Sequence, residues 1–249
     1  MVTDIQTVLW KESKEIFALT TAVSGRGGTI RLLIIIGIFG VMMPLQSGSK
    51  WLTTPITVMV FAWIPFLLVG GVVADSFAGE RERHTLETLL ASRLPDRAIL
   101  FGKIAACVVY GWGLAMASLL LGLITMNITY GEGRLLIFPA DIGIGALLLS
   151  FLVALFAAAL GVLVSLRAAT ARQAAQAFSL GFLFFFLPLL ILPALPSPPP
   201  SVQAALETAI FGGNIWPIIL GAAIFLVLLD AVLLGLAMAR FQRSRLLLD

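Results

Sequence analysis

The sequence predicts an all-α membrane protein with six transmembrane helices in a single domain that covers residues 1–249. Three observations predict it. Hydrophobic residues make up 60% of the chain and charged residues only 12%, whereas soluble proteins carry about 25% charged residues. Apolar segments close to the roughly 20 residues of a membrane helix recur along the chain. Basic residues gather in alternate connecting segments, as the positive-inside rule requires.

The predicted spans cover residues 32–45, 54–74, 99–128, 142–166, 175–195 and 215–239. The first is short and contains Pro44, and several prolines blur the end of the fifth. Of the sixteen Lys and Arg residues, all but Lys50 and Arg134 fall in the N-terminal segment, the even-numbered loops and the C-terminal tail. The positive-inside rule then predicts that both termini are cytoplasmic, and that residues 196–215 form an extracytoplasmic loop.

The sequence of residues 1–28, which precedes the first span, predicts an amphipathic helix followed by a turn. Apolar residues recur there at helical spacing and form one stripe, which Glu12 interrupts: Ile5, Val8, Leu9, Ile16 and Leu19. Such a helix is expected to lie in the membrane interface. The sequence SGRGG would form the turn into the bilayer.

The segment from residue 75 to 98 is unusually charged for this chain and contains its one histidine, His84. The sequence GERERHTLETLLAS within it predicts a short amphipathic helix, with acidic residues early and leucines along one edge. A helix of this kind is suited to docking a soluble partner. The other interpretation is a solvated loop that obeys the positive-inside rule, but a topology signal needs only Lys and Arg, and this segment also carries five acidic residues.

The residues of this segment carry a resemblance to a known family. The run Glu80-Arg81-Glu82-Arg83, the following TLETLLAS and the closing ILFGK at residues 99–103 resemble the signature of type-2 ABC exporter permeases. The chain departs from that signature at His84, where the family usually has glycine, and at Arg93, where it usually has proline. LWKESKEIF resembles the family's elbow helix, and SLRAATARQAAQAF resembles its second cytoplasmic loop.

The resemblance implies a transport permease: the membrane subunit of an ATP-driven exporter in a bacterial or archaeal plasma membrane. Two permease copies, often identical, pair with two copies of a separate ATP-binding subunit, which would hold ATP and magnesium. The chain has no G-x-x-x-x-G-K-[ST] run, so we expect it to be no enzyme and to bind no cofactor, metal or nucleic acid itself. The resemblance implies that the elbow and coupling helices contact the ATPase through Gly79, Glu80, Arg81, Glu82, Arg83, Thr85, Leu86, Glu87, Lys11 and Glu12.

The second and fifth helices would line the transport path in this family. The candidate pathway residues are Met59, Trp63, Phe66, Phe178, Phe182, Phe185 and, in the sixth helix, Asp230. An aromatic wall suits apolar or amphipathic cargo, although packing or lipid contact is the other interpretation of these aromatics. Asp230 also supports an alternative function, an ion-coupled secondary transporter, because an ionisable residue within a membrane helix is costly. An intramembrane protease is disfavoured, since His84 lies on the charged loop.

Overall fold

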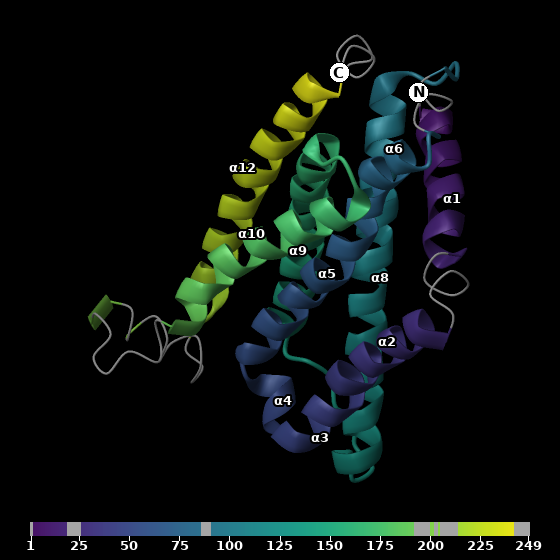
Figure 1. The fold of residues 1–249 in the computed structure, drawn as a ribbon. Helices are drawn as coiled ribbons and strands as arrows, with labels where there is room; N and C mark the ends of the chain where they lie inside the picture. Colours follow the sequence, from purple (N-terminus) through teal and green to yellow (C-terminus); the bar gives the residue numbers. More distant parts are fainter. Residues whose placement is uncertain are drawn as a thin grey trace.

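The computed structural model of the chain describes residues 2–18, 26–85, 91–191, 200–201, 204 and 214–241. These residues form a helical bundle in which the start of α1, the end of α12 and α6 lie at the same end (Figure 1). Its elements are α1 (Val2–Ala18), α2 (Arg26–Gly37), η2 (Ile38–Met42), α3 (Met43–Ser47), α4 (Lys50–Thr53), α5 (Ile56–Ala74), η3 (Asp75–Gly79), α6 (Glu80–Glu82), α8 (Asp96–Tyr130), α9 (Ala140–Arg167), α10 (Ala171–Ile191) and α12 (Trp216–Arg240). No strand occurs among the described residues.

Four helices in the described part of the chain are long and apolar enough to cross a membrane. They are the continuous helix Ile56–Glu82, which joins α5, η3 and α6, together with α8, α9 and α12. They correspond to the second, third, fourth and sixth predicted spans. The first predicted span lies within a shorter apolar helix, Leu32–Ser47. The fifth coincides with most of α10, whose last residues border the undescribed segment 192–199.

The centre of the bundle is the contact between α5 and α9. Glycine lets the two helices approach closely, since a Cβ at Gly161 of α9 would overlap Val73 of α5. Close approach at small residues is how membrane helices gain packing energy, because lipid tails are as apolar as the side chains and burial alone favours neither. Gly111 of α8 meets Val69 of α5 in the same way. The bundle therefore depends on the absence of side chains at specific positions.

The π-helical turn η3 lies where α5 ends. A π-helical turn disturbs the regular backbone hydrogen bonds, and Ser165 of α9 provides partners here. Its hydroxyl accepts hydrogen bonds from the backbone N–H groups of Phe77 (3.3 Å) and Ala78 (2.9 Å) and donates one to the carbonyl of Ala74 (3.0 Å). The end of the α5 helix is thereby bonded to the last turn of α9.

Helix α1 packs beside α8, as Figure 1 shows. Its buried residues are Val8, Glu12 and Ile16, which are spaced four apart along one face. Glu12, which was predicted to interrupt the apolar stripe, lies on this same buried face and is only 6% exposed. Leu19 of the predicted stripe lies outside the described residues. Gly102 of α8 makes room for the helix, since a Cβ there would meet the side chain of Val8 at 2.5 Å.

The predicted helix from Gly79 to Ser92 was wrong in its bounds. Residues 80–82 continue the α5 helix instead of starting a new one, and the chain turns at His84, which has a φ of 58°. That backbone conformation is left-handed and interrupts any helix. The segment 86–90, which contains Leu86 and Glu87, lies outside the described residues, and residues 91–95 form turns and bends.

Candidate functional site

A buried lysine joins three separate elements at the α6 end of the bundle. The Nζ atom of Lys103 in α8 donates hydrogen bonds to Glu12 Oε1 of α1 (2.9 Å), Glu80 Oε1 of α6 (3.0 Å) and the carbonyl oxygen of Ser76 in η3 (3.0 Å). Lys103 is only 1% exposed. All three N–H groups of the ammonium therefore have an oxygen partner, as a buried charge requires.

Lys11 lies at the exposed edge of the same cluster. Its Nζ is 3.3 Å from Glu15 Oε1, 3.5 Å from Glu12 Oε1 and 3.8 Å from Glu80 Oε1. Partial burial alone would lower the pKa of Lys11, but the attraction of the three carboxylates outweighs it, so this pKa lies above the ordinary lysine value. Lys11 is therefore charged at neutral pH, and its contribution to stability would be lost only in strongly alkaline solution. We call Lys11, Glu12, Glu15, Glu80 and Lys103 the Lys103 cluster.

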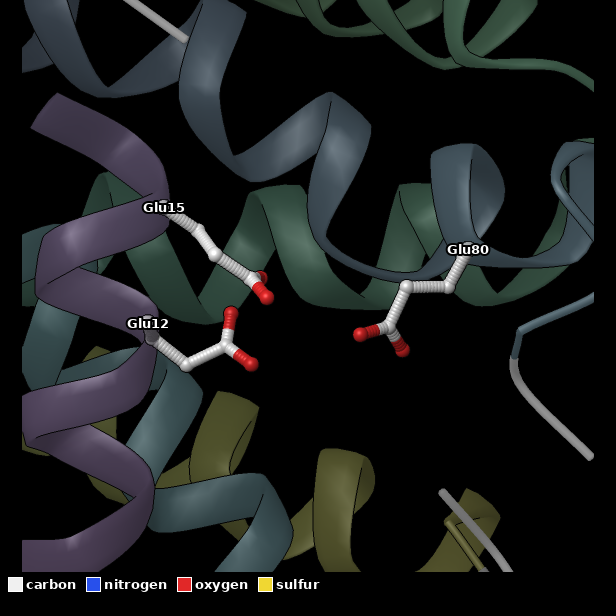
Figure 2. A group of neighbouring side chains, drawn as sticks. All are labelled: Glu12, Glu15 and Glu80. Atoms are coloured by element: carbon white, nitrogen blue, oxygen red, sulfur yellow. The ribbon is translucent and has the colours of Figure 1, made fainter. Parts of the chain in front are cut away.

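The three carboxylates of the cluster point towards one another (Figure 2). Their oxygens lie within 4.8 Å of each other, as the ligands of a metal ion would. The ammonium group of Lys103 bonds to Glu12 and Glu80, and that of Lys11 lies nearest to Glu15. These lysines supply positive charge where a metal ion would otherwise supply it, so the geometry is explained as an ion-pair network.

The next two charged residues, Arg81 and Glu82, bind the end of the α5 helix to other elements. Arg81 donates hydrogen bonds to the carbonyl oxygens of Ala168 (2.7 Å) and Leu166 (3.2 Å), at the end of α9. The carboxylate of Glu82 accepts a hydrogen bond from the backbone N–H of Ala171, the first residue of α10 (3.2 Å). These contacts follow the helix dipole, because cations are favoured at helix C-termini and anions at N-termini.

Arg83 forms an ion pair with Asp75, eight residues earlier in the chain. One of its guanidinium nitrogens lies 2.9 Å from both carboxylate oxygens of Asp75 in η3. Gly79 lies between them in sequence, and a Cβ at that position would overlap the Asp75 carboxylate. The glycine of the motif is thus needed for the approach of the Asp75 side chain.

The structure thus brings together most of the residues that the resemblance assigned to ATPase coupling, but in contacts within the chain. Glu80 is buried and Arg81 is half-buried, whereas Glu82, Arg83 and Thr85 are exposed. Leu86 and Glu87 lie outside the described residues. Sequence reasoning missed Lys103 as a site residue. Its signal was the closing Gly102-Lys103 pair of the signature, in which the glycine admits α1 and the lysine pairs with it.

His84 offers a direct test of this turn. A left-handed backbone costs a non-glycine residue about 1–2 kcal/mol, and His84 has a φ of 58°. His84→Gly should therefore raise the free energy of unfolding by up to about 1 kcal/mol, measured by thermal unfolding in detergent. His84→Ala is the matched control, because it removes the imidazole and keeps the Cβ. Equal stabilisation by both variants would refute the backbone explanation.

The structure places the predicted pathway residues in several different environments. Phe66 and Phe178 are buried and stack with ring centroids 4.7 Å apart, so they belong to the core that joins α5 and α10. Met59 and Trp63 line a cavity between α5, α9 and α12. The side chains of Phe182 and Phe185 lie outside the described part. Asp230 is 3% exposed and lies in the middle of α12.

Comparison with known proteins identifies a family for the chain. No curated protein sequence matches the chain significantly. A family described as ABC-2 family transporter protein matches residues 53–239, from the start of the α5 region to the end of α12. The match covers the helices that meet at the η3 turn and more than half of the sequence. The chain therefore belongs to the ABC-2 transporter family of membrane proteins.

Proposed function

We propose that the chain is the permease subunit of an ATP-driven exporter, that a separate ABC ATP-binding subunit docks on its α6 end, and that its cargo is apolar or amphipathic. Two permease copies and two ATPase copies form the transporter. Membership of the ABC-2 family supports the permease and its partner. The observation that carries the coupling mechanism is the set of bonds around residues 75–83, which link one short segment to α1, α8, α9 and α10.

The mechanism follows from those bonds. Residues 83–95 connect the α5 helix to α8, so a push on this loop acts on both helices at once. Through Glu80 and Lys103 the push would move α1 and α8 together, and through Arg81 and Glu82 it would move the end of α9 and the start of α10. Buried charge pairs resist separation, because an unpaired buried charge is costly. The segment can therefore transmit movement rather than absorb it.

In this proposal α1 acts as the elbow helix, and the charged segment of residues 75–98 makes the coupling contact with the ATPase. Two exposed aromatic residues on α1, Trp10 at 66% and Phe17 at 64% exposure, suit contact with the membrane interface. Glu82 and Arg83 are exposed beside the loop and are placed to border an ATPase docked there. The termini would be cytoplasmic, in agreement with the distribution of Lys and Arg.

The test is co-purification of the tagged chain from its native membranes, followed by an ATPase assay. An ATP-binding subunit should be recovered with the wild-type chain. Leu86→Glu, which places a charge on the apolar edge of the predicted coupling helix, should lower recovered ATPase activity roughly tenfold or more, the effect of losing about 1.4 kcal/mol of binding. Arg134→Glu is the control, since Arg134 is exposed in the loop at the opposite end of the bundle. Recovery of the chain without any ATPase would refute the proposal.

The ion-coupled alternative is less well supported. Its one observation is Asp230, and no basic side chain bonds to Asp230 among the described residues. Transport in vesicles that contain the complex separates the two functions. The ATP-driven exporter requires ATP and continues without an ion gradient, whereas a secondary transporter shows the reverse.

A further inference from the structure

Helix α12 contacts the rest of the bundle along one narrow face. Its buried residues are Ile219, Ala223, Asp230 and Ala237, whose spacings of four and seven positions place them on one side of the helix. That side packs against α9, where a Cβ at Gly145 would meet the side chain of Ile219 at 2.7 Å. We call the contact between these four residues and α9 the α12 seam. Asp230 lies in the middle of the seam, and the other three residues are apolar.

The carboxyl group of Asp230 is shielded from solvent and from other polar groups. Asp230 is 3% exposed, and neither of its oxygens has a hydrogen-bond partner among the described residues. An ionised carboxylate only accepts hydrogen bonds, and the backbone N–H groups in the interior of a helix are already bonded to carbonyls of the same helix. The α12 seam therefore offers an ionised Asp230 no donor.

The level of Asp230 along α9 follows from the contact between Gly145 and Ile219. α9 and α12 run in the same direction, from the α4 end of the bundle towards the α6 end (Figure 1). Asp230 is eleven residues beyond Ile219. It therefore lies roughly level with Phe156, eleven residues beyond Gly145, since both helices rise 1.5 Å per residue. Phe156 is itself buried, so the carboxyl group lies in an apolar part of the bundle.

No charged side chain in the part of the chain that the structure describes compensates the carboxylate at this level. α5 has no charged residue from Ile56 to Ala74. The charged residues of the other elements around α12 lie near helix ends: Asp141 and Arg167 in α9, Asp75 in η3, Arg172 in α10 and Arg240 in α12. Arg167 and Arg240 are ten or eleven residues beyond the level of Asp230, roughly 15 Å away along the helix axes. An ionised Asp230 would thus be a buried, unpaired charge, which is strongly unfavourable.

A proton satisfies Asp230 where these neighbours do not. The protonated carboxyl group is neutral and gains an O–H donor. The seam supplies acceptors for that donor, because a backbone carbonyl oxygen in a helix keeps a second lone pair; the carbonyl of Leu226, one turn earlier in α12, is an acceptor of the kind that side-chain hydroxyls use in helices. A metal ion is a poor substitute, since it needs several oxygen ligands and Asp230 supplies the only carboxyl group of the seam.

We infer that Asp230 is a proton-binding site, that the packed α12 seam holds the proton, and that loss of the proton favours separation of α12 from α9. The carboxyl O–H bond breaks, water takes the proton, and the carboxylate forms as the seam opens. The packed state binds one more proton than the separated state, so its stability falls as the pH rises. The inference goes beyond the proposed function, because the site needs neither the ATPase nor a cargo.

Infrared spectroscopy of the full-length chain in detergent tests whether the proton is present. A protonated carboxyl group has a carbonyl stretching band that a carboxylate lacks, so Asp230→Asn should remove such a band from the wild-type spectrum at neutral pH. Asp141→Asn is the matched control, because Asp141 lies in the first turn of α9; it should leave the band unchanged. Equal bands in wild type and Asp230→Asn would show that Asp230 is ionised and would overturn the inference.

Thiol labelling tests the link between the proton and the seam. Ala237→Cys, in a Cys107→Ser background, places a thiol at a position of the seam that is 0% exposed. Its rate of reaction with a maleimide should rise with pH more steeply when residue 230 is Asp than when it is Asn, by up to roughly tenfold per pH unit over the range in which only the separated state has lost the proton. Ala239→Cys, at an exposed position of the same helix, should show no difference between the two backgrounds. The same pH dependence of Ala237→Cys in both backgrounds would overturn the inference.

Discussion

Replacing Lys103 by methionine should destabilise the protein by about 3–5 kcal/mol, the cost of removing one partner from a buried ion pair. Methionine keeps the length of the side chain but leaves the carboxylates of Glu12 and Glu80 close together without the ammonium between them. Since Glu12 is on α1 and Glu80 on α6, their repulsion should release α1 from α8. Thermal unfolding in detergent measures the stability, and limited proteolysis of α1 measures the release.

Two comparisons make the Lys103 prediction specific. Lys11→Met removes the other lysine of the cluster, but its side chain is 49% exposed, so the expected loss is below about 1 kcal/mol. Combining Lys103→Met with Glu12→Gln and Glu80→Gln removes all three charges and should recover most of the stability, because a neutral set leaves no unpaired charge. If Lys103→Met and Lys11→Met had equal effects, the Lys103 cluster would not be the link between α1 and the bundle.

Gly161→Ala should destabilise the protein by about 1–3 kcal/mol, the usual cost of overpacking a close-packed core. Alanine favours a helix by up to about 1 kcal/mol over glycine, so a net loss would show that the contact outweighs the propensity. The new Cβ would overlap Val73, which is 0% exposed and has no space into which to move. The measurement is again thermal unfolding in detergent.

Two further alanine substitutions serve as the control and the rescue for Gly161→Ala. Gly235 of α12 has no atom within 4 Å of the position that a Cβ would take, so Gly235→Ala should be neutral or slightly stabilising. Val73→Ala combined with Gly161→Ala should restore stability relative to Gly161→Ala alone, because it removes the atoms that overlap. Additive losses in the double variant would contradict a direct contact between α9 and α5 at this point.

The helices were predictable because hydropathy and length decide them. Residues 99–128 and 142–166 were predicted as spans, and α8 and α9 contain both segments. The first span was harder, since the apolar helix there is short. The positions of Phe66 and Phe178 could not be read from the sequence, because a helix that is apolar all round gives no signal for the side that faces a neighbour.

The charged site was predictable in its location but not in its contacts. The run from Glu80 to Arg83 stood out because charge is rare in this chain, and acidic residues there were the correct sign that more than topology is involved. The contacts of this site join residues far apart in sequence: Arg81 bonds to Ala168 across 87 positions, and Lys103 bonds to Glu12 across 91. Lys103 was visible only as the closing lysine of the signature, and nothing in that signature identifies Glu12 as its partner. The left-handed turn at His84 was visible only as a departure from the glycine of the resembling family.

The length of α8 has a mechanical consequence. Its 35 residues contain no proline, and at 1.5 Å per residue they form a rod about 52 Å long, well beyond the roughly 30 Å of the bilayer's hydrocarbon core. Near the N-terminal end of α8, Lys103 bonds the helix to Glu12 of α1 and Glu80 of α6. A tilt of about 10° about that point would carry the far end sideways by about 7 Å, given the same rise per residue. α8 can thus act as a lever arm that enlarges a small displacement at its Lys103 end into a wide one at its far end.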